Sequence, residues 1–144
     1  MKYLSMLFIS LLLFSCGENK GEKKDNSLNK ETGVDFSNKG IGPIKELKFD
    51  AINEELVQKG AAAYRSKCTA CHAIDKKLIG PALKGIYKRR SPEWVVNLLL
   101  NPTEMLKKDP IAMALLKEYN NIMMLNQNLS EDEALAIAEF MRTL

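Results

Sequence analysis

The stretch "CTACH", Cys68 to His72, contains two of the three cysteines of this 144-residue chain and its only histidine. Two cysteines three positions apart, followed at once by a histidine, are typical of covalent haem attachment, in which both thiols become thioethers and the imidazole binds the iron. A large planar cofactor then supplies much of the core of a small domain. We therefore expect one covalently attached haem c, with Cys68 and Cys71 as its anchors and His72 as an axial ligand.

Three other chemistries use a similar spacing. A thioredoxin-like dithiol opens a helix after a strand, whereas this motif closes a helical stretch and no strand-like run lies near it. Zinc prefers four Cys or His ligands, and outside the motif the chain offers only Cys16. A disulfide between Cys68 and Cys71 would close a very small loop and leave His72 without a role. Haem attachment is the interpretation that uses all three residues.

The N-terminus has the features of an export signal. Lys2 precedes an apolar run from Leu4 to Phe14, which is shorter than the roughly 20 residues that a membrane-spanning helix needs. Residues 1–15 are therefore predicted to be a signal peptide. The end of this run, "LFSC", is similar to the lipobox of bacterial lipoproteins, which implies cleavage before Cys16 and lipidation of that cysteine. The alternative is an ordinary signal peptide with an incidental cysteine, and both alternatives place the protein outside the cytoplasm.

The segment that follows differs sharply in composition from the rest of the chain. From residue 17 to about residue 40 it is rich in charged residues, Gly, Asn and Ser and has few apolar ones. Such a composition cannot bury a core, so residues 16–40 are predicted to be a lipidated cysteine followed by a flexible tether. Residues 41–144 are then of the length of one domain.

Four stretches of that domain carry helix signals. Two of them begin with a capping residue followed by proline, and the last one begins with a capping box between Ser130 and Glu133. The expected capping residues are Asn53, Ser91, Asp109 and Ser130. No convincing strand is present. The predicted class is all-α, with about four to five helices packed around one haem.

The order of the motifs resembles that of the class I, single-haem bacterial cytochromes c over nearly the whole of residues 41–144. The motifs are "CTACH", "IGPALKG", "SPEWVVNLLLNP", "MMLNQNLS" and a final amphipathic helix. The resemblance implies a small cytochrome c fold in which the first and last helices cross closely. Gly60 and Tyr64 of the first helix and Phe140 of the last would lie at that crossing.

The resemblance also implies the surroundings of the iron. The backbone carbonyl of Pro81 would accept the second ring N–H of His72, and a methionine would bind the opposite face of the haem. In similar cytochromes this methionine lies six residues before the cap of the last helix, which selects Met124. Leu125 stands where a proline often stiffens the loop, so Met123 remains an alternative.

Two further groups of residues are expected around the haem. Trp94 and one of Arg89 or Arg90 are candidates for binding the propionates, because a buried carboxylate needs a donor or a positive partner. The candidates for the apolar walls are Leu78, Ile79, Leu83, Trp94, Val95, Leu98 and Leu99.

Two axial ligands would leave the iron no open position for a substrate, so the sequence predicts an electron carrier and not an enzyme. The resemblance implies a redox donor such as the cytochrome bc complex and a respiratory terminal oxidase or reductase as acceptor. Six basic residues between Lys76 and Arg90 would steer an acidic partner. Nucleic acid and small-molecule substrates are not expected, and the periplasmic side of a bacterial membrane is the expected location. A haem-based gas sensor or ligand-binding module with a labile distal ligand is the alternative, and a peroxidase-like enzyme is a weaker one.

Overall fold

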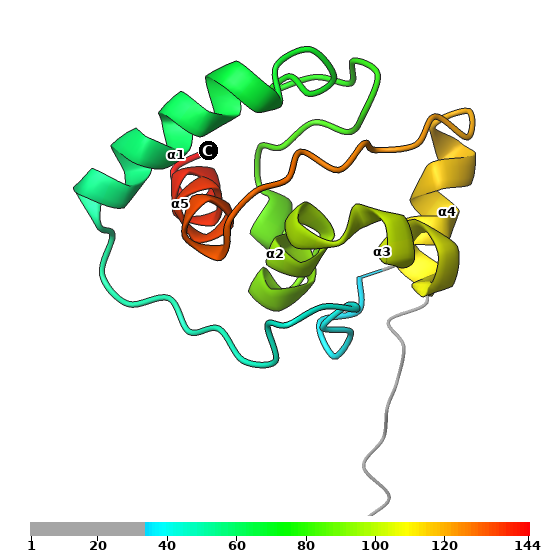
Figure 1. Cartoon of the computed structure of the whole chain (residues 1–144), viewed down its shortest axis with the longest axis horizontal. Coiled ribbons are helices and arrows are strands. Elements are labelled where there is room, and N and C mark those ends of the chain that lie inside the picture. Colours follow the sequence, from blue (N-terminus) through cyan, green and yellow to red (C-terminus); the bar gives the residue numbers. More distant parts are fainter. Residues whose placement is uncertain (1–33) are drawn as a thin grey trace, which may run out of the picture.

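The computed structural model describes residues 34–144, and within this range it contains five α-helices, one short 3-10 helix and no β-strand element (Figure 1). The elements are α1 (Glu54–Lys67), η1 (Ile86–Lys88), α2 (Pro92–Leu100), α3 (Pro102–Lys108), α4 (Pro110–Glu118) and α5 (Glu131–Met141). The predicted all-α class is confirmed. No helix in this part of the chain is both long and apolar enough to cross a bilayer. The expected signal peptide, the lipidation site at Cys16 and most of the expected tether lie outside the described residues.

Each predicted capping residue begins a helix. The side chains that accept hydrogen bonds from backbone N–H groups of the first turn are those of Asn53, Ser91, Asp109 and Ser130. The Glu133 carboxylate in turn accepts a hydrogen bond from the backbone N–H of Ser130, which completes the capping box. These side chains satisfy N–H groups that have no partner within the helix, and this is why the sequence predicted the four helix starts correctly.

Helix α3 is an element that the sequence analysis did not predict. Helix α2 ends at Leu100, two residues before Pro102. In the structure Pro102 is also the first residue of α3. Proline suits this position because its missing N–H has no helical partner there and its φ angle is already helical. The same residue therefore ends one helix and begins the next.

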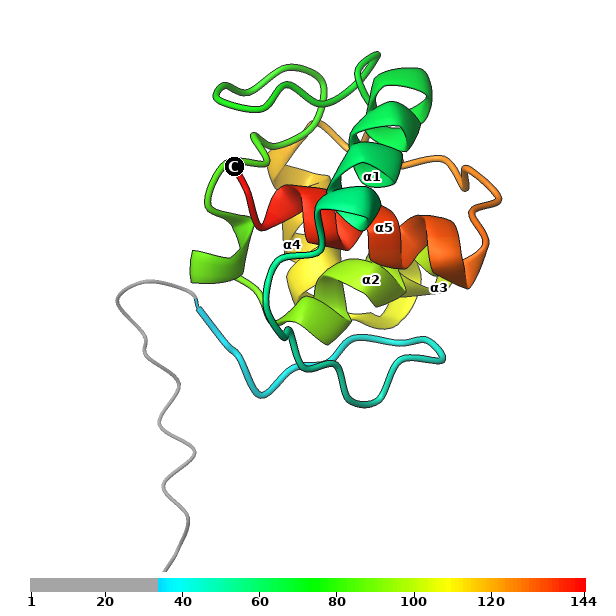
Figure 2. The ribbon, with the colours of Figure 1, turned by 90° about the vertical axis from the view of Figure 1, so that its left-hand side faces the viewer.

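Helices α1 and α5 cross in close contact, and this is the most extensive contact between two helices (Figure 2). A Cβ atom on Gly60 would lie 1.9 Å from the carbonyl oxygen of Ala136, so only glycine allows the two backbones to approach this closely. The rings of Tyr64 and Phe140 pack beside this point with their centroids 5.4 Å apart. The crossing implied by the resemblance is confirmed, with these residues at its centre.

Residues 38–47, which we call the N-terminal strap, run along α2 (Figure 2). The buried amide of Asn97 donates hydrogen bonds to the backbone carbonyls of Lys39 and Ile44 and accepts one from the N–H of Ile44. The buried carboxylate of Glu93 accepts a hydrogen bond of 2.8 Å from the Lys39 ammonium group. The last residues of the segment expected to be a tether therefore contact the domain.

Candidate functional site

The CTACH motif begins where α1 ends. Cys68 is the C-terminal cap of α1, and its carbonyl accepts hydrogen bonds from the N–H groups of Cys71 at 3.0 Å and His72 at 2.9 Å. These bonds fold the motif into a tight turn. The Tyr64 hydroxyl donates a hydrogen bond of 2.8 Å to the carbonyl of His72 and so ties the turn back to α1. Both thiols and the imidazole are thereby held together at one end of this helix.

The two thiols differ in their surroundings. Cys71 is exposed, and Cys68 is partly buried. Burial raises the pKa of the Cys68 thiol, although the positive charge of Lys67 opposes this. Because an apolar surrounding disfavours the thiolate, Cys68 is a neutral thiol at pH 7 before a thioether forms.

The imidazole of His72 is fixed by the segment that follows the motif. Its Nδ1 lies 3.0 Å from the carbonyl oxygen of Pro81. A carbonyl oxygen can only accept, so Nδ1 carries the proton and Nε2 keeps its lone pair. Gly80 lies against the ring, since a Cβ atom there would be 2.4 Å from Cε1 of the imidazole. A glycine at this position therefore permits the ring orientation that Pro81 selects.

A cavity adjoins the motif and has two lobes, of about 260 and 100 Å³. The residues that line both lobes are Cys68, His72, Pro81, Leu98, Leu115 and Met124. The larger lobe extends toward α4 and the segment after it, and the smaller lobe extends between α2 and the end of α5. His72 and both thiols thus face a largely apolar space enclosed by several elements.

Six of the seven expected wall residues line this cavity, and Leu78 does not. Leu78 is 47% exposed, because it lies in the loop after the motif and not behind it. Helix α4 supplies a wall that the sequence analysis did not assign, made of Ala112, Leu115, Leu116 and the adjacent Tyr119. Their spacing on one face of α4 was visible in the sequence. The sequence did not show that this face of α4 borders the cavity.

The two candidate methionines occupy different positions. Met124 is partly buried and lines both lobes, whereas Met123 lines only the larger lobe and is 47% exposed. Met105 is fully buried in the core and Met113 is 39% exposed, and neither lines the cavity. Of the two methionines, Met124 is therefore more enclosed. It is also better placed to contact a group that His72 binds in the cavity.

The three side chains expected near the propionates, Trp94, Arg89 and Arg90, all line the smaller lobe. The only N–H of the Trp94 ring donates to Asp109 at 3.0 Å, and Arg89 donates to the backbone carbonyls of Ala82 and Lys84. These donors already have partners that do not line the cavity, and the roles of Trp94 and Arg89 toward a propionate stay a prediction. Arg90 also lines this lobe, and its buried Nε has no hydrogen-bond partner in the described part of the chain.

Comparison with known proteins identifies the family to which this site belongs. The sequence profile described as "Cytochrome c" matches residues 57–144, which is more than half of the chain. The chain belongs to the cytochrome c family. Cytochrome c-551 of Stutzerimonas stutzeri is 49% identical over 37 residues, a stretch that spans 25% of this chain and 36% of that protein.

Two solved structures of cytochromes c share the fold. A cytochrome c from Rhodothermus marinus superposes with a TM-score of 0.68 at 40% identity, over 71% of this chain and 88% of that one. The cytochrome c domain of a Pseudomonas putida protein superposes with a TM-score of 0.52 at 31% identity, over 58% of this chain and 85% of that one. The small cytochrome c fold that the motifs predicted is confirmed.

The protein therefore binds one covalently attached haem c, as the family does. The residues present fit this group. Two thiols and an imidazole lie at one side of an apolar cavity, and Gly80 leaves room for the imidazole. The buried Nε of Arg90, which has no partner among residues 34–144, would donate to a carboxylate such as a propionate.

Proposed function

We propose that this cytochrome c is a membrane-anchored electron carrier of the periplasm, with its haem iron ligated by His72 and Met124. The observation that carries the proposal is that these two side chains line both lobes of one cavity. Haem c supplies a one-electron Fe(III)/Fe(II) couple, and a thioether ligand raises its potential relative to a second imidazole. Two protein ligands leave no coordination position for a substrate, so catalysis is not part of the proposal.

The surrounding residues would hold the ligands in place. The Pro81 carbonyl keeps the proton on Nδ1 of His72, which would leave the lone pair of Nε2 free to bind the iron. The apolar side chains of α2 and α4 that line the cavity would limit the access of water to the bound group. Arg90 would bind a propionate through its unpartnered donor. Cys68 and Cys71 would fix the ring covalently, so that electron transfer requires no exchange of the cofactor.

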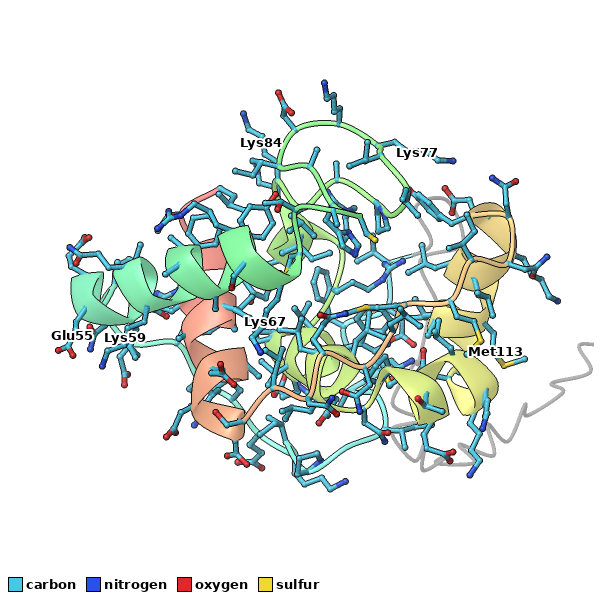
Figure 3. All side chains as sticks on the ribbon, turned by 45° about the horizontal axis from the view of Figure 1, so that its top comes forward. Glu55, Lys59, Lys67, Lys77, Lys84 and Met113 are labelled. Carbon is cyan, nitrogen blue, oxygen red and sulfur yellow. The ribbon has the colours of Figure 1, made fainter. Side chains whose placement is uncertain are left out.

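The mouth of the larger lobe suits a transient protein partner. Its lining includes the exposed apolar side chains of Ile79, Ile122, Met123 and Leu125. Four exposed lysines lie nearby in sequence, namely Lys76, Lys77, Lys84 and Lys88, and the labelled Lys77 and Lys84 project outward in Figure 3. We propose that they steer an acidic redox partner. The two arginines of the predicted basic group are only partly exposed and bind backbone carbonyls, so they contribute less to steering.

The membrane anchor and the partners rest on sequence features. Lipidation at Cys16 and a polar tether would keep the domain at the membrane surface while it moves between partners. The donor would be a complex of the cytochrome bc type, and the acceptor a terminal oxidase or reductase of a respiratory chain.

The axial ligand can be tested on the full-length, haem-loaded protein with Met124→Ala, and with Met123→Ala as the matched control. Met124→Ala should abolish the Met-to-Fe(III) charge-transfer band and lower the reduction potential, whereas Met123→Ala should preserve both. The reverse pattern would assign the ligand to Met123. If neither variant changes the band, and the reduced wild-type protein binds CO at neutral pH, the iron is open, and the protein is a ligand-binding module and not a carrier.

A further inference from the structure

Three N–H donors converge on Asp109, a buried side chain that the proposed function does not use. Its Oδ1 accepts hydrogen bonds from the Trp94 indole at 3.0 Å and from the backbone N–H of Ala112 at 2.9 Å. Its Oδ2 accepts one from the Asn38 side-chain amide at 2.7 Å. Asp109 is only 3% exposed. A carboxyl group whose two oxygens both accept, and donate to nothing, has the bonding pattern of the ionised form.

Within residues 34–144 the charge on this carboxylate has no cation in direct contact, and Arg90 interacts with it only through space. Among residues 34–144, no Lys, Arg or His forms an ion pair with Asp109. Helix capping does not require the charge, because asparagine and serine cap helices as well as aspartate does. A buried and unpaired charge destabilises a fold. Capping alone therefore does not explain why a charged residue stands here.

Asp109 binds a residue that lines the haem cavity. The Trp94 indole lines the smaller lobe, and its N–H points to Asp109 instead of into that lobe. The guanidinium of Arg90, which lines the same lobe, lies 5.6 Å from the centre of the indole ring. Asp109 itself lines neither lobe, but it binds Trp94 of the smaller lobe and Ala112 of the larger one. Water does not screen a charge in this location as it screens a surface charge.

We propose that Asp109 is a potential-setting residue, whose buried negative charge stabilises the oxidised haem and lowers its reduction potential. This inference rests on the proposed function as an electron carrier. The N-terminal strap holds the charge in place, because Asn38 donates to Asp109 and accepts a hydrogen bond from Ser91 through its carbonyl. Through this contact the strap would influence the reduction potential of the haem.

The test is the reduction potential of the haem-loaded protein in three variants. Asp109→Asn removes the charge and keeps the size of the side chain and its capping oxygen. It should shift the Fe(III)/Fe(II) equilibrium toward Fe(II) by several-fold, because a charge inside the protein, where the effective dielectric constant is about 20, is screened less than a charge in water. Asn38→Ala removes one donor but keeps the charge, so it should lower the unfolding midpoint and change this equilibrium by less than about twofold.

The third variant separates the effect of the charge from an effect of lower stability. The double variant Asn38→Asp with Asp109→Asn reverses the hydrogen bond and moves the charge to the partly exposed position 38. It should recover stability relative to Asp109→Asn and retain the shifted potential. Equal potentials for wild type and Asp109→Asn, or equal shifts in Asp109→Asn and Asn38→Ala, would overturn the inference. In either case a wild-type protein with an intact Met-to-Fe(III) band would leave the proposed function standing.

Discussion

Replacing Gly60 by alanine tests the closest contact in the fold. Alanine is favoured over glycine in a helix interior by about 1 kcal/mol, so propensity alone predicts a more stable protein. The structure predicts the opposite. The new Cβ would lie 1.9 Å from the Ala136 carbonyl oxygen, whereas real Cβ atoms do not come within 3.0 Å of a neighbour, so α1 and α5 must separate by about 1 Å. Forced expansion of a packed interface costs about 1 to 3 kcal/mol or more, and backbone atoms cannot rotate away as a flexible side chain could.

Because the clash is with backbone atoms, the upper part of that cost, about 2 to 3 kcal/mol, applies. Subtracting the propensity gain of about 1 kcal/mol, we expect Gly60→Ala to lower the free energy of unfolding by about 1 to 2 kcal/mol. Urea denaturation of the haem-loaded protein, followed by far-ultraviolet circular dichroism, measures this directly. The control is Ala62→Gly at an exposed position of the same helix, which should lose about 1 kcal/mol through propensity alone. If Gly60→Ala is more stable than wild type, α1 and α5 do not approach each other as closely as described.

Three other expectations concern charge and processing. The rate of electron transfer to an acidic partner should fall as ionic strength rises, and neutralising the four exposed lysines between residues 76 and 88 should remove most of that dependence; a salt-insensitive wild-type rate would mean that these lysines do not steer. Burial tends to raise the pKa of the Glu139 carboxyl, but its bonds to Arg142 and to a backbone N–H outweigh this and lower it. The ionised form therefore stabilises the fold above the unfolded pKa of about 4.3, and this contribution is lost as pH falls through the lowered folded pKa. Glu139→Gln should accordingly weaken the dependence of stability on pH in that acid range, and an unchanged dependence in chemical denaturation would contradict the assignment. Mass spectrometry of the mature protein should find Cys16 as an acylated N-terminus, and an unmodified Cys16 or cleavage elsewhere would exclude the lipid anchor.

The sequence by itself determined the features that depend on residues close together in the chain. A cap and the N–H that it satisfies lie two or three positions apart, so Asn53, Ser91 and Ser130 could be recognised without a structure. The CTACH motif is equally local, and it specified the cofactor and its mode of attachment. The Gly60 crossing required the family resemblance in addition, because a glycine on a helix face does not by itself indicate which backbone approaches it.

Only the tertiary structure decided which distant groups meet. Trp94 had a donor that the sequence analysis directed toward a propionate, but Asp109, fifteen positions away, receives it. Asn38 reaches the same carboxylate from 71 positions away, and it lies in a segment that composition alone predicted to be a tether. A polar side chain binds whichever partner the packed core leaves beside it, and burial makes an unsatisfied donor costly. The choice among several chemically equal partners is therefore set by packing, which no local pattern in the sequence encodes.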